Sequence, residues 1–179
     1  MSSLLVVTGP PGAGKSAVAC VLAERFERSA LVEGDAFFAF LRRGAIAPWL
    51  PESKEQNEAV TRAAGAAAGR FASGGMATVY DGVVGPWFLP VFAAATGLDR
   101  LDYVVLLPTV ERCVQRVRTR TGHGFGDEAA TRKMHHEFAT APVDDRHVLA
   151  DPPGGPDVAA DLVEAALAAG TLAYTPSPG

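Results

Sequence analysis

The sequence predicts an α/β protein in which helices cover both faces of a five-stranded parallel sheet. Short apolar stretches alternate with segments of helical periodicity along the chain. The apolar stretches are continuous rather than interrupted at every second residue, which is typical of strands buried on both faces. A turn rich in glycine and proline also follows the first apolar stretch and leads into a helix. Together these patterns predict three layers, with helices on each side of one sheet.

The first part of the chain predicts two strands and two helices. Residues 4–8 form a compact apolar stretch that glycine and proline end. Residues 14–28 predict a helix because apolar side chains recur every four residues, at Val18, Leu22 and Phe26. Residues 30–33 predict a second strand that ends at Gly34-Asp35, and we expect a helix to follow through residue 43.

The middle of the chain predicts a long helix between two strands. Residues 52–73 are rich in alanine, and Gly74-Gly75 stop this helix. Residues 76–80 predict the third strand, which Asp81-Gly82 close. A further helix is expected over residues 86–96.

The last part begins with the clearest buried strand of the sequence, over residues 101–107. An arginine-rich helix is expected over 110–121. Asp127 is a favoured N-cap residue, and it predicts a helix through residue 140. Residues 146–150 form a weak fifth strand, and residues 158–169 predict the last helix.

The predicted domain organisation is simple, because neither an internal repeat nor a domain boundary is evident. We expect one domain over residues 1–170, with a lid at about 112–127. The tail, residues 171–179, is expected to be disordered because it ends in a run of proline, serine and glycine.

Composition narrows the class of protein. Of 179 residues, 48% are hydrophobic and 20% are charged, which is typical of a globular protein. The net charge of −4 argues against nucleic acid or an anionic membrane as the main partner. The two cysteines, Cys20 and Cys113, fit no metal spacing and are interpreted as reduced packing residues. With no apolar stretch long enough to span a membrane and no leader before the first strand, a cytoplasmic location is expected.

The glycine-rich turn carries the strongest functional signal. Its pattern is G-x-x-x-x-G-K-S between a strand and a helix, with the residues Gly9, Pro10, Pro11, Gly12, Ala13, Gly14, Lys15 and Ser16. Glycines let backbone N–H groups surround phosphate oxygens, and the helix N-terminus adds further donors. Lys15 can reach the terminal phosphates and Ser16 can ligate Mg²⁺. The pattern predicts a nucleotide site with ATP and Mg²⁺, and the alternative is a strand–helix turn without a ligand.

This motif does not define the reaction. A GTPase should carry an N-K-x-D base-reading motif, which is absent. The stretch Asp151-Pro152-Pro153-Gly154 matches the D-x-x-G switch by letters, but it follows the last strand, so we interpret the match as chance. A motor ATPase would need a second subdomain. The motif therefore identifies a nucleotide site and leaves the reaction open.

Acidic residues follow two further predicted strands, where ligands bind in open parallel sheets. Asp35 is a candidate to accept the proton of an attacking hydroxyl or to orient that hydroxyl, and its alternative role is a helix N-cap. Asp81 ends an apolar strand in the manner of a carboxylate that holds Mg²⁺ through water, and its alternative role is a turn residue. Glu33 is equally consistent with a site or a surface residue.

The arginine-rich helix is a candidate lid. Arg112, Arg116 and Arg120 are spaced by four, so they share one helical face beside a glycine-rich loop at 122–126. Such a lid could close over ATP and neutralise charge on the transferred phosphoryl group. The alternative is a solvated basic face. The proline-rich segment 151–157 could pack on the adenine or serve only as a loop.

Taken together, these residues resemble those of P-loop small-molecule kinases, specifically the chloramphenicol phosphotransferase-like and gluconate kinase-like members of the nucleoside and shikimate kinase group. The stretches that carry the resemblance are Gly9 to Ser16, "VEGDAFF", "VYDG" and "RVRTRTGHGF". The last is similar to the lid segment of gluconate kinases, with an extra glycine before the phenylalanine. The resemblance implies a three-layer P-loop fold, an acceptor role for Asp35, a lid role for Arg116 and Arg120, and phosphate binding by Gly9 to Ser16. Lys15 and the two lid arginines are the expected catalytic residues that stabilise the transferred phosphoryl group.

The acceptor is predicted from what this chain lacks. Adenylate kinase-like enzymes carry arginines after Gly-Asp and after the third strand, and these bind the acceptor's phosphate. Here aromatic and apolar residues stand in those places, namely Phe37, Phe38, Phe40, Trp87 and Phe88, with Trp49 nearby. A neutral acceptor such as an antibiotic, a nucleoside or a sugar derivative is therefore favoured. Arg42, Arg43 and Arg62 could replace the missing arginines, and each aromatic could simply belong to the core.

Three hypotheses follow. The leading one is an ATP- and Mg²⁺-dependent kinase that phosphorylates a hydroxyl of a small molecule. The second is a nucleoside monophosphate kinase, and the third is a nucleotide-binding switch protein without phosphotransfer.

Overall fold

The computed structural model describes residues 4–119 and 126–176. Its sheet has the strand order β2-β3-β1-β4-β5, and these five strands are parallel, as predicted. Their bounds are β1 (Leu4–Thr8), β2 (Ser29–Glu33), β3 (Ala77–Asp81), β4 (Leu101–Leu107) and β5 (Val148–Ala150). The central strands β1, β3 and β4 are almost entirely buried, which explains their continuous apolar sequences.

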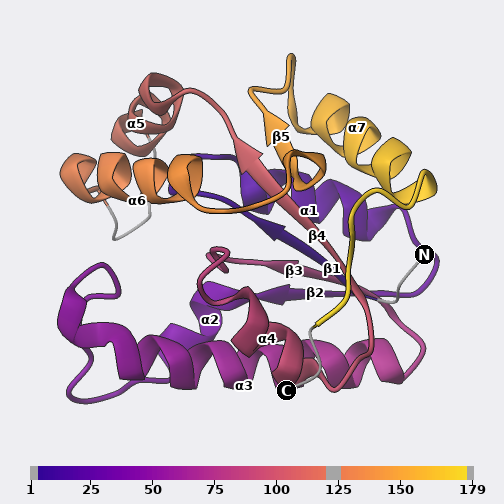
Figure 1. Ribbon diagram of the computed structural model, residues 1–179, viewed down its shortest axis with the longest axis horizontal. Helices are drawn as coiled ribbons and strands as arrows, with labels where there is room; N and C mark the ends of the chain where they lie inside the picture. The colour runs from indigo at the N-terminus through magenta and orange to yellow at the C-terminus, as the bar shows by residue number, and fades with distance from the viewer. Residues whose placement is uncertain (1–3, 120–125, 177–179) are drawn as a thin grey trace.

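Helices cover both faces of the sheet, as Figure 1 shows. The helices α1 and α7 pack on one face, in a core that includes Leu22 and Val163. The helices α3, α4 and α6 pack on the other, in a core that includes Phe92 and Phe138. The bounds are α1 (Lys15–Glu24), α2 (Gly34–Ala39), α3 (Lys54–Ser73), α4 (Leu89–Thr96), α5 (Val110–Thr119), α6 (Glu128–Thr140) and α7 (Pro156–Ala168).

Two of the predicted helices end several residues earlier in the structure. The first ends at Glu24 instead of residue 28, since the chain must turn there to enter β2 at Ser29. The second, α2, ends at Ala39 instead of residue 43, ahead of Gly44, whose backbone has a φ of +71°. Asp127 caps α6 as predicted, because its carboxylate accepts a hydrogen bond from the Ala130 N–H.

The prediction of a disordered tail from residue 171 is wrong for residues 171–176. Leu172 is buried, and its carbonyl accepts a hydrogen bond from the Tyr103 N–H. The pair Ala173–Tyr174 then forms β6, which runs antiparallel to the start of β4. The apolar side chain of Leu172 therefore anchors a sixth strand that the proline-rich end of the sequence obscures.

The two cysteines differ in their surroundings, so the prediction that both are packing residues holds for only one. Cys113 is buried in α5, whereas Cys20 is exposed on α1. Burial raises the pKa of the Cys113 thiol to about 11, although Arg116 and Lys15 act in the opposite direction. In the described part of the chain, no helix combines the length and the apolar character that crossing a membrane requires.

Candidate functional site

The predicted phosphate-binding loop lies between β1 and α1, at the carboxyl edge of the sheet. Gly9 and Gly12 have φ angles of +146° and +78°, in the region that favours glycine. A Cβ atom on Gly9 would collide with the carbonyl oxygen of Leu106, and one on Gly12 with the backbone of Cys113. The glycines therefore let the loop pack against the end of β4 and the start of α5.

The start of α1 is open to a ligand. Gly14 is its N-cap, and no side chain caps the first N–H groups of this ten-residue helix. Ser16 is exposed in the first turn, and Lys15 is half-buried with its Nζ 3.2 Å from the carbonyl oxygen of Pro10. Uncapped N–H groups beside a lysine favour an anion at this helix end.

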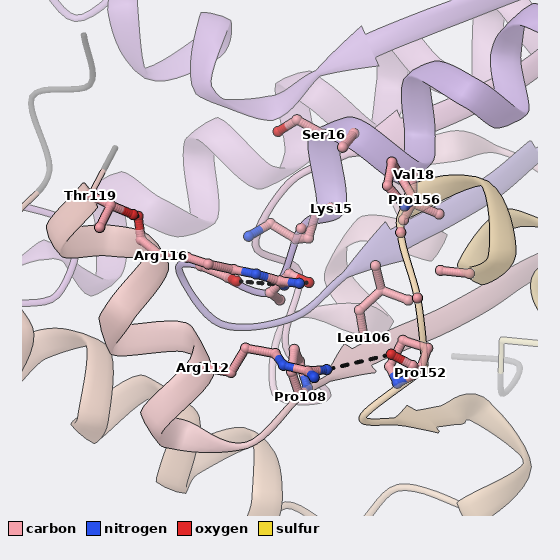
Figure 2. A pocket seen from close by; sticks show the side chains of 17 residues that line it. Lys15, Ser16, Val18, Leu106, Pro108, Arg112, Arg116, Thr119, Pro152 and Pro156 are labelled. Carbon is pink, nitrogen blue, oxygen red and sulfur yellow. Dashed lines mark hydrogen bonds between the residues drawn. The ribbon is translucent and has the colours of Figure 1, made fainter. Parts of the chain in front are cut away.

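The loop forms one wall of a pocket of about 420 Å³. Figure 2 shows that the opposing walls come from α5 and from the segment between β5 and α7. Lining residues beyond Gly12 to Val18 are Leu106, Pro108, Arg112, Arg116, Thr119, Pro152, Gly154, Gly155, Pro156 and Ala159. The pocket thus joins a polar end at Lys15 to an apolar end at Leu106 and Pro152.

The arginines of α5 make different contacts in the structure. Arg116 donates through Nη1 to the carbonyl oxygens of Gly12 and Ala13, each at 3.2 Å, so it lies on the phosphate-binding loop. Arg112 points into the pocket from the same helix (Figure 2). Arg118 lies outside the pocket lining and pairs with Glu128 on α6. The predicted Arg120 and residues 120–125 of the lid lie outside the described part of the chain.

An ion pair spans the apolar end of the pocket. The Arg112 Nη1 lies 2.7 Å from the Asp151 carboxylate and 3.5 Å from the Pro152 carbonyl oxygen. Asp151 has a φ of +37°, which is uncommon outside glycine, and its N–H donates to Leu107. This contact between α5 and the proline-rich segment was missed, because the sequence match at residues 151–154 indicated only a chance motif. The many prolines before α7 were the one sequence feature that set this segment apart.

Asp81 lies at the end of β3, between β1 and β2, opposite Val7 and Glu33. Its side chain is buried, at 8% exposure, and its Oδ1 atom has no hydrogen-bond partner among the described residues. An unsatisfied buried carboxylate oxygen is costly unless a ligand completes it. Mg²⁺ usually takes one or two carboxylates and keeps several waters. Asp81 therefore fits a magnesium site, and the described residues hold no larger cluster of three or more metal-binding side chains.

Asp35 and Glu33 lie at the end of β2. Glu33 is the N-cap residue of α2 but its side chain makes no capping hydrogen bond, and Asp35 stands exposed in the first helical turn. Asp35 is therefore not the N-cap residue of α2, which was the alternative role expected for it. It lies at the same carboxyl edge of the sheet as Asp81, since β2 and β3 are neighbouring parallel strands in which Glu33 pairs with Asp81.

The six aromatic residues predicted to line an acceptor pocket fall into different groups. Phe37 and Phe88 pack against the core. Phe40 and Trp87 are 74% and 43% exposed, while Phe38 and Trp49 are half-buried. The Phe40 ring packs edge-on against the Phe37 ring, with 5.8 Å between their centroids, and the centroids of the Trp87 and Phe138 rings are 5.2 Å apart. Exposed aromatic side chains thus remain on the segments that follow β2 and β3.

Comparison with solved structures places this arrangement among known folds. A sugar kinase from Janibacter sp. HTCC2649 matches with a TM-score of 0.68 at 20% identity, over 92% of this chain and 94% of its own. A gluconokinase from Sinorhizobium meliloti 1021 matches with a TM-score of 0.65 at 20% identity, over 95% and 94%. The chain has the fold of P-loop small-molecule kinases.

A third P-loop kinase-like neighbour is the tunicamycin resistance protein of Deinococcus radiodurans. It matches with a TM-score of 0.63 at 18% identity, over 99% of this chain and 100% of its own. No protein-family profile matches the chain, and no curated protein matches it by sequence. The structural likeness confirms the predicted fold class, and the roles of the individual site residues stay predictions.

Proposed function

We propose that this protein is an ATP- and Mg²⁺-dependent kinase that phosphorylates a hydroxyl group of a small, neutral molecule. One observation carries the proposal: the phosphate-binding loop, the buried Asp81 carboxylate, whose Oδ1 has no partner among the described residues, and the exposed Asp35 carboxylate share one edge of the sheet. The loop accounts for phosphate binding, Asp81 for a metal ion, and Asp35 for an acceptor. A nucleotide-binding switch has no need of the third group.

The pocket beside α5 is the proposed ATP site. Its glycine-rich end and the α1 N-terminus would hold the phosphates, with Lys15 at the terminal phosphates. The base would lie at the apolar end, beside Arg112 and Pro152. Arg116, which lines the same pocket and contacts the loop, would balance charge on the phosphates. Pro10 and Ala13 belong to the same loop and shape its turn.

Ser16 and Asp81 would hold Mg²⁺, directly or through water. Bound there, the ion would offset the negative charge of the phosphate oxygens. The orphaned Oδ1 of Asp81 supports this assignment, because a protein seldom buries a carboxylate oxygen without a partner.

Asp35 is proposed to act on the acceptor. The acceptor oxygen forms a bond to the γ-phosphorus, the bond from that phosphorus to the β–γ bridging oxygen breaks, and ADP departs. The hydroxyl proton passes to the Asp35 carboxylate, whose exposed position lets the acceptor reach it. A neutral acceptor is favoured because Phe38 stands where nucleotide kinases of similar design carry a phosphate-binding arginine.

The test is ADP formation from Mg-ATP across neutral alcohols, sugars, nucleosides, hydroxylated antibiotics and nucleoside monophosphates. We expect turnover with a neutral member. Asp35→Asn should cut that turnover about a hundredfold or more and leave ATP binding intact by titration. A matched control is Asp99→Asn, since Asp99 lies away from this edge, just before β4. Turnover only with monophosphates would contradict the proposed acceptor, and ATP binding without any turnover would favour the switch hypothesis.

A further inference from the structure

The loop between β3 and α4, residues 82–88, is anchored to the sheet at Val84. The Val84 N–H donates to the Thr8 Oγ atom at 2.9 Å, and the Tyr103 hydroxyl donates to the Val84 carbonyl oxygen, also at 2.9 Å. Thr8 and Tyr103 are fully buried, and Val84 is only 1% exposed. Side chains of two other strands, β1 and β4, thus fix both backbone polar groups of one loop residue.

The position of this anchor links two parts of the proposed site. Thr8 is the last residue of β1 and directly precedes the phosphate-binding loop, whereas Val84 follows closely after Asp81. The proposed chemistry assigns no role to the Thr8 or Tyr103 hydroxyl. Buried hydrogen bonds of this kind fix one geometry, because breaking either leaves a buried backbone group without its partner. The anchor therefore sets where the loop after Asp81 lies relative to the phosphate-binding loop.

The anchored loop carries Trp87. The Gly85 carbonyl oxygen accepts hydrogen bonds from the N–H groups of Phe88 and Leu89, at 2.8 and 3.0 Å, so the chain turns directly after the anchor. A Cβ atom on Gly85 would collide with the six-membered part of the Trp87 indole, which therefore lies directly against this glycine. The indole also packs against Phe138 of α6, yet 43% of Trp87 is exposed.

An aromatic ring that is held on two sides and still exposes much of its surface is suited to pack against a ligand. The loop that carries Trp87 begins at the carboxyl end of β3, the edge of the sheet where Asp35 and Asp81 lie. A wall that is fixed before the ligand arrives also binds at a lower cost in conformational entropy.

We propose that Thr8 and Tyr103 are positioning residues, which hold Val84 so that Trp87 stands as a fixed wall of the acceptor site. The inference rests on the proposed function and adds to it the side chain that the acceptor packs against. Neither hydroxyl touches the reacting atoms; both act through the loop that carries Trp87.

The first measurement is the fluorescence of Trp87, and it needs no acceptor. The chain has two tryptophans, so Trp87 is the only one left in a Trp49→Phe background. In that background Thr8→Val keeps the shape of the side chain but removes the acceptor of the Val84 N–H. We expect the emission to move to longer wavelength and the fluorescence anisotropy to fall, because the loop loses a buried restraint. Thr8→Ser keeps the hydroxyl and should restore both values.

The second measurement is the KM for an acceptor that the protein phosphorylates. We expect this KM to rise roughly tenfold in Thr8→Val and in Tyr103→Phe, because a displaced wall weakens acceptor binding, and at least as much in Trp87→Ala. The KM for ATP should not change, since none of these residues lines the ATP pocket. The Thr8→Val/Tyr103→Phe double variant should raise the acceptor KM by less than the product of the single effects, because both hydroxyls act through Val84.

Thr78→Val is the matched control. Thr78 is a buried threonine at the other end of β3, and its hydroxyl donates to the Met76 carbonyl oxygen at 3.1 Å. This variant should lower the melting temperature and leave the Trp87 emission and the acceptor KM unchanged. If Thr8→Val did the same, the inference would be overturned and the kinase proposal would stand. Absence of acceptor-dependent turnover in the wild type would overturn the kinase proposal together with the role given to Trp87.

Discussion

The Arg112 guanidinium on α5 lies 2.7 Å from the Asp151 carboxylate, which follows β5. The two residues are far apart in the sequence, yet their ion pair joins two walls of the proposed ATP pocket. Both side chains are partly exposed, at 41% and 43%. Such a pair adds little to stability, so its value lies in holding the Arg112 guanidinium in place.

Replacing Asp151 should therefore affect ATP binding more than folding. Asp151→Asn tolerates the positive φ and removes only the charge. We expect the KM for ATP to rise roughly threefold to tenfold, equivalent to about 1 kcal/mol, with little change in melting temperature. The control is Glu58→Gln, which breaks the exposed Arg62–Glu58 pair on α3 and should leave the KM unchanged. A lower melting temperature with an unchanged KM would make the pair purely structural.

Asp81 should govern the magnesium requirement. Asp81→Asn keeps the side-chain volume but removes the charge of a carboxylate whose Oδ1 has no partner in the part of the chain that the structure describes. We expect turnover to fall about a hundredfold and the Mg²⁺ concentration for half-maximal activity to rise, without a loss of melting temperature. Asp102→Asn is the control, since Asp102 is also buried but lies at the start of β4. It should alter stability and leave the Mg²⁺ requirement as it is; an unchanged requirement in Asp81→Asn would remove Asp81 from the metal site.

Gly34 should be intolerant of any side chain. Gly34→Ala would place a Cβ against the Tyr80 hydroxyl and 3.0 Å from Tyr80 Cζ, and we expect a loss of about 1–3 kcal/mol in the free energy of unfolding. Tyr80→Phe in the same chain should restore part of that loss, because it removes the nearest atom. Urea unfolding measures both. Gly126→Ala, where nothing lies within 4 Å, should cost little, and additive losses in the double variant would place the strain elsewhere.

His147 should make stability fall in mild acid. Its ring is buried against Tyr103, where Nδ1 lies 3.0 Å from the Tyr103 carbonyl oxygen, and burial lowers its pKa below 6.5. Because the unfolded chain then binds the proton first, this contribution is complete above pH 6.5 and is lost as pH falls toward the lower folded-state pKa. We expect His147→Asn, which keeps an amide donor, to show a weaker decline between pH 7.5 and 5.5. The same decline in the free energy of unfolding with falling pH in both proteins would contradict this prediction.

The parts of the fold that local sequence determines were predicted well. The five parallel strands, the loop from Gly9 to Ser16 and the Asp127 cap depend on short apolar stretches, glycine spacing and a capping residue. Strand β6 was missed because it depends on a long-range pairing with β4, and the proline-rich end suggested disorder instead.

The positions of the candidate site residues along the strands could be predicted, but their contacts with other segments could not. The sequence placed Asp35 and Asp81 at strand ends, which the structure confirms, but it could not show that the Asp81 Oδ1 has no hydrogen-bond partner among the described residues. The Arg112–Asp151 pair and the packing of the Tyr80 hydroxyl against Gly34 and Gly82 arise from tertiary contacts between distant segments. No spacing rule reveals such contacts, because they depend on how α5 and the strand ends pack.

Transfer of labelled γ-phosphate from ATP tests the central proposal most directly. The protein is incubated with Mg-ATP and a neutral polyol, and the label is located on the acceptor, on inorganic phosphate or on unreacted ATP. We expect the label on the acceptor, in a phosphate ester that Asp35→Asn fails to form. Label on inorganic phosphate alone, at the same rate with and without the polyol, would contradict it.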